Sequence, residues 1–424
     1  MTLLIIYIII FSTAYLGYSF ISKKYHEKNN FNQRKTVTFG DESAVTANRS
    51  ASVISIITLF IIWAAFTGSS LSPLHVPGPF IGDTVFTYTA VNAQNQTQQA
   101  QVFIRVNSPV EEKNATPNIL KKQSSGFAKD DFITMQAWRN KLIRVQKNDT
   151  GGRDKNYKII KINNQPIAPQ QTIKVDNGKL TMTAKGSLSF IPNKGWQMEA
   201  VWLPPPEAVI TRFIEIAKDG YQNISLFENI GWSLLRVISG FLLGCLVGIP
   251  LGYAMGLNSW VRGWFDPIVE FMRPIPPLAL IPLIIIWFGI WESGKISLLF
   301  LAALWIMTIA ARAGVSGIQI SKIHAAYSLG ASKIQILIHV IIPNSLPEIF
   351  TGARVAMGVC WGTVVAAELV AAEKGAGKMI IAASKFQQTD VVIMGIILIG
   401  IIGFGIDVLM RKAEAYFIPW KGKA

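Results

Sequence analysis

The sequence contains little cysteine and little histidine, and this scarcity excludes several kinds of site. Two cysteines occur in 424 residues, Cys245 and Cys360, and both lie within apolar stretches. Neither a disulfide framework nor a thiolate metal site is therefore expected, and we assign both cysteines a packing role. The four histidines are scattered without the spacing of metal ligands, so no metal centre is predicted.

Acidic residues are also scarce relative to basic ones, with 25 Asp and Glu against 40 Lys and Arg and a formal net charge of +15. Half of all residues are hydrophobic, which exceeds what one soluble core needs and indicates a membrane protein. In this class a basic excess marks cytoplasmic loops and contact with anionic lipid. The composition therefore predicts the lipid bilayer, and not nucleic acid, as a partner.

Seven apolar runs are long enough to cross a bilayer as helices. They cover residues 3–21, 52–68, 229–255, 265–288, 296–314, 349–371 and 391–410. Positive charge follows the first run instead of preceding it, which favours an uncleaved anchor with its N-terminus outside over a secretion signal. The positive-inside rule then places the basic segments 23–49 and 411–423, together with loop 315–348, in the cytoplasm. A multi-pass membrane protein is expected.

The segment 69–203 contains no run that could span, and it alternates β-branched or aromatic residues with polar ones, as half-buried strands do. Turn sequences at Asp176-Asn177-Gly178 and Ala184-Lys185-Gly186 supply the positive φ that hairpins need. The polar, lysine-rich stretch 111–146 fits a long loop or a partly helical segment. The expected topology places this β-rich domain outside the cytoplasm. Strands are predicted at residues 84–90, 101–106, 158–162, 172–175, 179–183 and 187–191.

This β-rich segment resembles one bacterial cadherin-like or immunoglobulin-like repeat cut in two. Residues 82–107 look like the second half of such a repeat, and residues 148–152 with 178–196 look like its first half. The resemblance implies a β-sandwich whose halves occur in permuted order. After it, residues 207–217 carry apolar positions at helical spacing, which predicts an amphipathic helix along the outer membrane interface.

A short motif in the inner loop carries the clearest functional information. Paired alanines let a short helix pack closely, a glycine permits a sharp turn out of it, and a proline is expected to stop the next helix. The motif resembles the signature of ABC importer permeases, in which such a knob docks on the ATPase subunit. The residues that match or replace its positions are His324, Ala325, Ala326, Leu329, Gly330 and Pro343. His324 stands where the family has Glu, which removes any ion pair made by that Glu.

The resemblance extends over residues 203–424, together with 52–68 as the family's first span. The segments "SLLRVISGFLLGCLVGIPLGYAMG" and "VAAELVAAEKGAGKMI" and the ending "IPW" look like the taurine, nitrate and sulfonate branch, with taurine permeases closest. The family implies a type I importer permease fold, a homodimer, a separate ATPase that binds ATP and magnesium, and a periplasmic substrate-binding protein. The chain would bind no cofactor and would have no catalytic residues, because it is a transport subunit and not an enzyme.

The expected spans and strands divide the chain into four parts. They are an anchor span with a basic loop (1–51), a first core span (52–68), an outer β domain (69–203) and a permease core with five spans (204–424). The family does not account for the outer β domain or the anchor. The function expected is import of a small organic anion, with taurine first and nitrate or an aliphatic sulfonate as alternatives.

Two features of the spans suggest close packing and a translocation path. Glycines recur every fourth residue from Gly240 to Gly256, which lets a neighbouring helix approach. Prolines break the following span, and broken backbone at membrane depth is tolerated only where protein or a water-filled path satisfies it. An ionisable residue inside a span is a functional candidate by default, although an ion pair or a snorkelling side chain is the structural alternative for Arg273. The pathway candidates are Glu270, Arg273, Pro274, Pro276, Pro277 and Glu368.

Other functions fit the sequence less well. Gly375-Ala376-Gly377-Lys378 resembles part of a phosphate-binding loop, but Ala372 replaces its first glycine and Met379 its hydroxyl residue, so no nucleotide site is expected. A membrane-anchored adhesion or scaffold protein would need one span and not seven. An ion-coupled secondary transporter would need paired carboxylates at mid-membrane and inverted repeats, neither of which is evident.

Overall fold

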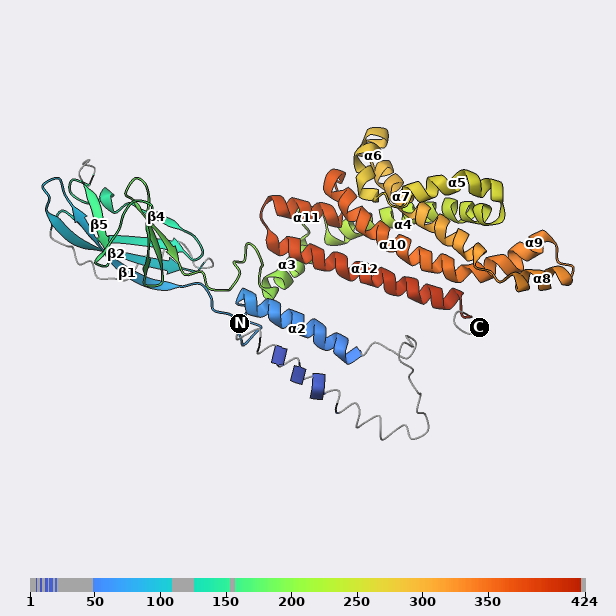
Figure 1. The fold of residues 1–424 in the computed structure, drawn as a ribbon, viewed down its shortest axis with the longest axis horizontal. Coiled ribbons are helices and arrows are strands. Elements are labelled where there is room, and N and C mark those ends of the chain that lie inside the picture. The colour runs from blue at the N-terminus through green and yellow to red at the C-terminus, as the bar shows by residue number, and fades with distance from the viewer. Residues whose placement is uncertain are drawn as a thin grey trace. The chain divides into compact units, whose positions relative to one another are not determined.

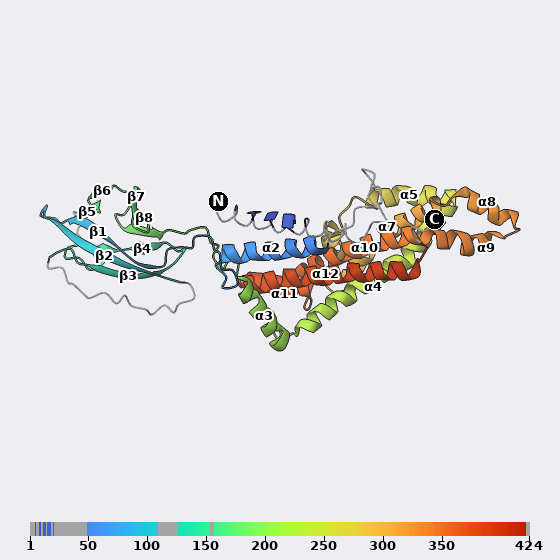
Figure 2. The ribbon, with the colours of Figure 1, turned by 90° about the horizontal axis from the view of Figure 1, so that it is seen from below.

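The computed structural model describes residues 49–108, 126–152 and 157–420, with scattered positions between 5 and 20. The chain forms two compact units, residues 1–207 and 208–424, and each is described by itself. The predicted anchor span 3–21 falls largely outside the described residues, and the basic loop that follows it lies outside them up to residue 48. Figures 1 and 2 show the elements of both units.

The first unit contains two β-sheets built from the predicted strands and three further ones. One sheet has the order β3-β2-β1-β5-β6 and the other the order β4-β9-β8-β7. All six predicted strands are present. The strands are β1 (Gly82–Val91), β2 (Thr97–Asn107), β3 (Asp131–Gln136), β4 (Lys141–Ile143), β5 (Lys158–Ile162), β6 (Gln165–Pro166), β7 (Thr172–Val175), β8 (Gly178–Met182) and β9 (Leu188–Pro192).

The two sheets share one apolar core and therefore form a β-sandwich. Phe86 and Ile104 from one sheet are buried in the same cluster as Leu180 and Phe190 from the other. Residues that alternate along each strand supply this core, because successive side chains point to opposite faces. The turns follow the expected chemistry: Asn177 has a φ of +63°. The cadherin-like or immunoglobulin-like identity of the sandwich stays a prediction.

The interpretation of residues 111–146 as a loop or partial helix is wrong over its described part. Strands β3 and β4 lie there, followed by a 3-10 turn, η2 (Val145–Lys147). β3 pairs in parallel with β2, from Val102 with Asp131 to Asn107 with Gln136. Parallel pairing requires a connection of a dozen residues or more, and the buried and exposed positions of β3 do not alternate strictly, so local periodicity did not reveal it.

A helix precedes the sandwich in the same unit. α2 (Arg49–Thr67) covers the predicted span 52–68, and its apolar part, Ser52–Thr67, is shorter than the four long apolar helices described next. The Trp63 indole N–H donates to the Pro204 carbonyl at 3.0 Å. Ser69 Oγ donates to Glu207 at 2.5 Å, so the chain that leaves the sandwich returns to the end of α2.

The second unit is helical and contains the five spans predicted for the permease core. Among the described residues four helical stretches are long and apolar enough to cross a membrane, and a bent pair makes a fifth. Its elements are α3 (Pro206–Asp219), α4 (Leu226–Leu257), α5 (Ser259–Met272), η3 (Pro277–Leu280), α6 (Ile281–Phe288), α7 (Glu292–Ser316), α8 (Ile320–Ser328), α9 (Lys333–Ile336), the π-helical turn η4 (Leu337–Ile341), α10 (Ile342–Ala371), α11 (Ala376–Lys385) and α12 (Thr389–Phe417).

The glycine row of α4 packs against α7, as its spacing predicts. A Cβ on Gly240 would overlap Leu299, and a Cβ on Gly244 would overlap Ala303. At Gly248 a Cβ would lie 2.8 Å from the Leu304 carbonyl oxygen, closer than real Cβ atoms approach. The missing side chains therefore allow backbone contact between the two helices, in the manner of small-residue interfaces in membranes.

Candidate functional site

The inner loop forms the expected helix, turn and helix. α8 and α9 meet at Gly330, which has a φ of +79°. The Gly330 N–H donates to Tyr327 O at 2.9 Å and the Ala331 N–H donates to Ala326 O at 3.1 Å, which closes the end of α8 in the way that left-handed glycine caps do. In Figures 1 and 2 this pair of short helices lies at the end of the unit opposite α11.

The two alanines of the motif face different surroundings. Ala326 is partly buried and packs against the cluster of Val315, Ile336 and Ile341, so it holds α8 onto its own unit. Ala325 and His324 are exposed, and the Leu329 side chain at the turn is 87% exposed. The turn therefore leaves an apolar side chain accessible for contact with a partner.

The expectation that Pro343 stops a helix is wrong. Pro343 lies in the first turn of α10, and the chain stays helical from α9 through η4 into α10. Proline has no N–H to donate, and its ring clashes with the carbonyl four residues earlier in a regular α-helix. The π turn accommodates this: the Ile342 N–H donates to Leu337 O, five residues back, which widens the helix ahead of the proline.

The proline-broken span is bent as the sequence predicts. α5 and the η3–α6 stretch meet at an angle of 93°, with Pro276 extended before η3 and Pro277 as its first residue. Pro274 lies in the turn between the two helices. The break therefore places non-helical backbone between two apolar helices, an arrangement that requires neighbouring protein or a water-filled path.

Arg273 lies at the end of α5 and its side chain is 65% exposed. It lies 3.8 Å from Glu270 one turn earlier, which is the pairing expected from the sequence. A closer partner for Glu270 is Arg312 of α7, at 3.1 Å, and Arg312 also contacts Asp266. Arg312 and Asp266 are not among the residues predicted from the sequence, because their pairing joins two separate helices.

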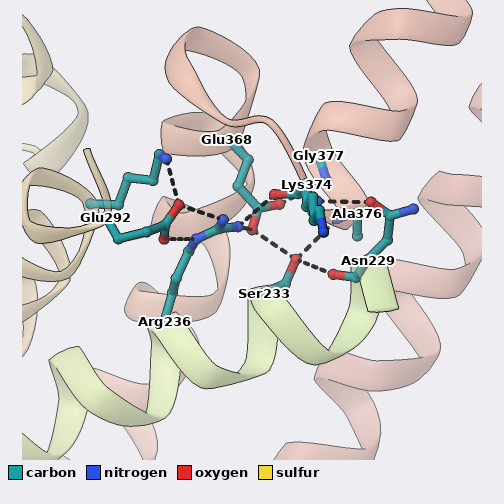
Figure 3. A network of polar contacts seen from close by, with 10 residues as sticks. Asn229, Ser233, Arg236, Glu292, Glu368, Lys374, Ala376 and Gly377 are labelled. Atoms are coloured by element: carbon teal, nitrogen blue, oxygen red, sulfur yellow. Dashed lines mark hydrogen bonds and ion pairs between the residues drawn. The ribbon is translucent and has the colours of Figure 1, made fainter. Parts of the chain in front are cut away.

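A second polar cluster centres on Arg236 of α4, whose side chain is 1% exposed (Figure 3). Its Nη1 donates to Glu368 Oε1 of α10 at 2.6 Å, and its Nε and Nη2 donate to the two carboxylate oxygens of Glu292 at 2.6 and 2.8 Å. Nη1 also donates to the Lys374 carbonyl at 2.8 Å. One guanidinium thus joins α4, α7, α10 and the turn before α11 through charge-assisted hydrogen bonds.

Glu368 is fully buried and accepts further hydrogen bonds. The Ser233 hydroxyl donates to Oε1 at 2.7 Å, and the Gly377 N–H donates to Oε2 at 2.9 Å. Both carboxylate oxygens therefore have partners, as a buried charge requires. The structure places this pathway candidate inside a junction of helices of its own chain, where both of its oxygens are bonded.

The Gly375-Ala376-Gly377 turn binds groups of its own chain through its amides. The Gly375 N–H donates to Asn229 Oδ1 at 2.9 Å and the Ala376 N–H donates to Ser233 Oγ at 3.0 Å. With Gly377 bonded to Glu368, three consecutive N–H groups, the kind that would hold a phosphate in a nucleotide loop, have internal acceptors. A Cβ at Gly375, which has a φ of +143°, would overlap the Glu368 carboxyl group.

Known proteins resemble large parts of this chain. The family model "Binding-protein-dependent transport system inner membrane component" matches residues 240–415. The taurine transport system permease protein TauC of Escherichia coli is 41% identical over 259 residues, covering 61% of this chain and 93% of TauC. The putative aliphatic sulfonates transport permease protein SsuC of the same organism is 38% identical and covers 53% and 84%. The nitrate import permease protein NrtB of Leptolyngbya laminosa is 31% identical and covers 46% and 70%.

Proposed function

The chain belongs to the family of binding-protein-dependent transport system inner membrane components and is the permease subunit of an ABC importer of the taurine, sulfonate and nitrate type, and we propose that it imports taurine. Support for taurine comes from the 41% identity with the Escherichia coli taurine permease. Taurine carries a sulfonate and an ammonium group, so an aliphatic sulfonate is the nearest alternative.

One geometric observation carries the transport function: the α8–α9 turn between two long apolar helices, α7 and α10. It combines a left-handed Gly330 with an exposed Leu329 and an inward-packed Ala326. In the proposed complex His324, Ala325 and Leu329 contact an ATPase subunit, while Ala326, Gly330 and Pro343 fix the shape of the turn. ATP and magnesium bind to that partner and not to this chain.

The proposed assembly further contains a second copy of the permease and a periplasmic substrate-binding protein, as the family implies. Arg273 is the residue that we expect to contact the anion, because its guanidinium is largely exposed beside the proline break. Glu270 and the prolines Pro274, Pro276 and Pro277 shape that region. Glu368 acts from within the Arg236 cluster and does not touch the anion.

The proposed topology places the β-sandwich in the periplasm and the C-terminal end of α12 in the cytoplasm. Cysteines introduced at Lys174 in β7 and Lys412 in α12 report on this, because both side chains are exposed. An impermeant thiol reagent should label Lys174→Cys in intact spheroplasts and Lys412→Cys only after permeabilisation. The reverse labelling pattern would contradict the topology.

The substrate is tested by reconstituting the permease with its ATPase and binding protein in liposomes. We expect ATP-dependent uptake of labelled taurine, with a tenfold excess of an alkanesulfonate competing less well than unlabelled taurine. Preferential uptake of the alkanesulfonate or of nitrate would overturn the taurine assignment and leave the importer class intact. Uptake that continues without the ATPase would contradict the importer class itself.

A further inference from the structure

The cluster around Arg236 joins the two helices that hold the coupling turn between them. α7 begins at Glu292 and leads into α8, while η4 and α10 lead away from α9, and α10 reaches Glu368 near its far end. Both carboxylates bind the same guanidinium of α4, at 2.6 Å. The ends of α7 and α10 that lie farthest from the coupling turn are therefore tied to one point.

The two helices are long enough to carry a displacement from the coupling turn to the Arg236 cluster. α7 has 25 residues and α10 has 30, which correspond to about 37 and 45 Å at about 1.5 Å per residue. Hydrogen-bonded helices of this length transmit displacement as stiff elements, and tightly packed contacts shift between discrete arrangements. A displacement that enters at α8 and α9 reaches the Arg236 cluster along both helices at once.

We propose that Arg236 is a positioning residue for transport: it clasps the outer ends of α7 and α10 to α4, so that force from the coupling turn moves these three helices and α11 as one block. The proposal rests on the proposed function, because it needs an ATPase that acts on α8 and α9. Arg236 itself does not contact the substrate, since its side chain is 1% exposed and four of its five N–H groups are bonded to Glu292, Glu368 and the Lys374 carbonyl.

The geometry favours a clasp over a simple packing role. Bonds to two carboxylates and a carbonyl group reach three separate elements from one fully buried side chain. The Trp232 ring lies 5.7 Å from the guanidinium and limits its movement. The turn before α11 is held to the cluster through Asn229, Ser233 and Glu368, and Arg236 adds the bond to the Lys374 carbonyl.

The decisive variant is Arg236→Met combined with Glu368→Gln. It removes both buried charges together, which avoids leaving one of them unpaired, and the amide that replaces the Glu368 carboxylate retains an oxygen that can accept from the Gly377 N–H. Glu292 keeps Lys295 at 2.8 Å. A matched control is Arg212→Met, which removes the outer ion pair between α3 and Asp390 of α12 without touching α7 or α10.

In liposomes with the ATPase and binding protein, the double variant should hydrolyse ATP within twofold of wild type and bind the ATPase normally, while taurine uptake falls at least tenfold. Arg212→Met should retain uptake within twofold. Arg236→Lys, which keeps the charge but cannot bridge two carboxylates in the same fork geometry, should fold and show an intermediate loss of uptake.

A second measurement follows the spacing between the outer ends of α7 and α10. Nitroxides at Ile290 and Val370, which are exposed and line one cavity beside α7 and α10, report the spacing of the two outer ends in a Cys245→Ala, Cys360→Ala background. Dipolar broadening should be the same in nucleotide-free and vanadate-trapped wild type, and should differ between these states in the double variant.

The clasp would be overturned if the double variant takes up taurine as fast as wild type and its dipolar broadening is the same in the nucleotide-free and vanadate-trapped states. Loss of ATPase binding in both the double variant and Arg236→Lys would also overturn it, by assigning Arg236 to folding instead of coupling. Either result leaves the proposed function standing. That function fails separately if the unaltered permease neither binds the ATPase nor takes up an anion.

Discussion

The guanidinium of Arg236 and the carboxylate of Glu368 lie 2.6 Å apart, with side chains that are 1% and 0% exposed. They are 132 residues apart in the chain and come from helices that are otherwise largely apolar. Separating two such charges is costly, because each would remain buried without its partner. The pair therefore links the stability of the helical unit to the junction of α4, α7, α10 and α11.

Removal of one partner alone should destabilise the unit. Glu368→Ala leaves Arg236 with the Glu292 carboxylate and the Lys374 carbonyl, and we expect a loss of about 2 to 4 kcal/mol in the free energy of unfolding, slightly below the usual cost of breaking a buried pair. Asp390→Ala, which breaks the partly exposed pair with Arg212, should cost about 0 to 1 kcal/mol. Denaturant titration of both variants in the same detergent compares them, and equal losses would contradict the buried pair's importance.

The glycine row of α4 should tolerate no side chain. Gly244→Val would overlap Ala303 of α7 and should cost about 1 to 3 kcal/mol, as overpacking of a close contact does. Gly231→Ala, in the same helix with no atom within 4 Å of the added Cβ, is the matched control. The control should leave the unfolding midpoint unchanged or raise it. A neutral Gly244→Val would mean that α4 and α7 are less closely packed than described.

The effect of a substitution at Gly330 should depend on the backbone conformation of this residue and not on the space around it. No atom lies within 4 Å of a Cβ at Gly330, but its φ of +79° is unfavourable for other residues. A β-branched residue there should cost about 1 to 2 kcal/mol and tilt α8, so Gly330→Val should reduce uptake strongly. Gly330→Asn tolerates this conformation better and should keep most uptake. Equal uptake in the two variants would contradict the conformational explanation.

The β-sandwich should lose stability as pH rises toward neutrality. Burial, with the nearby charge of Asp149, raises the pKa of Asp131 to about 7, above the ordinary value of about 3.9. The folded state therefore binds more protons than the unfolded state between these values. The stabilisation is complete below about pH 4 and disappears as pH rises through about 7.

Asp131→Asn should remove this dependence, since an amide has no charge to desolvate. We expect increased hydrogen-exchange protection of β2 and β3 at pH 8, after correction for the intrinsic exchange rate, and little change at pH 4. Asp83→Asn alters a half-exposed carboxyl group of the same sheet and should give no increase in protection at pH 8. Protection of Asp131→Asn that is unchanged at pH 8 would contradict the cost of burying this charge.

The five core spans were predictable because lipid leaves few structural choices. Backbone groups in hydrocarbon must bond within their own segment, so a long apolar run becomes a helix. The predicted run 229–255 lies within α4, Leu226–Leu257. The helix and turn at Gly330 followed from the resemblance to the permease signature together with the alanine and glycine positions. The strands that form local hairpins, such as β7 with β8, followed from alternation and turn residues.

Features that depend on distant pairing were not predictable. β3 pairs with β2 across a long connection. Arg236 was not predicted as a site residue, because it is a single cation within an apolar run. An ionisable residue in a span is a signal that could have identified it, but its partners Glu292 and Glu368 come from other helices. The π turn before Pro343 also escaped prediction, because it depends on how the chain accommodates a missing N–H within a continuing helix.

In the proposed complex the α8–α9 turn receives force from an ATPase subunit. Leu329→Asp places a charge on its most exposed apolar side chain without disturbing the Ala326 packing. Its matched control is Phe386→Asp, an apolar side chain 68% exposed that follows α11 at the other end of the unit (Figure 1).

The most direct measurement is co-purification of the ATPase with each detergent-solubilised variant, alongside uptake in the same cells. Loss of about 1 to 3 kcal/mol at the contact corresponds to roughly ten- to hundredfold weaker binding. We predict that Leu329→Asp loses the ATPase and uptake while inserting normally, and that Phe386→Asp retains both. Normal co-purification and normal uptake by Leu329→Asp would contradict the account.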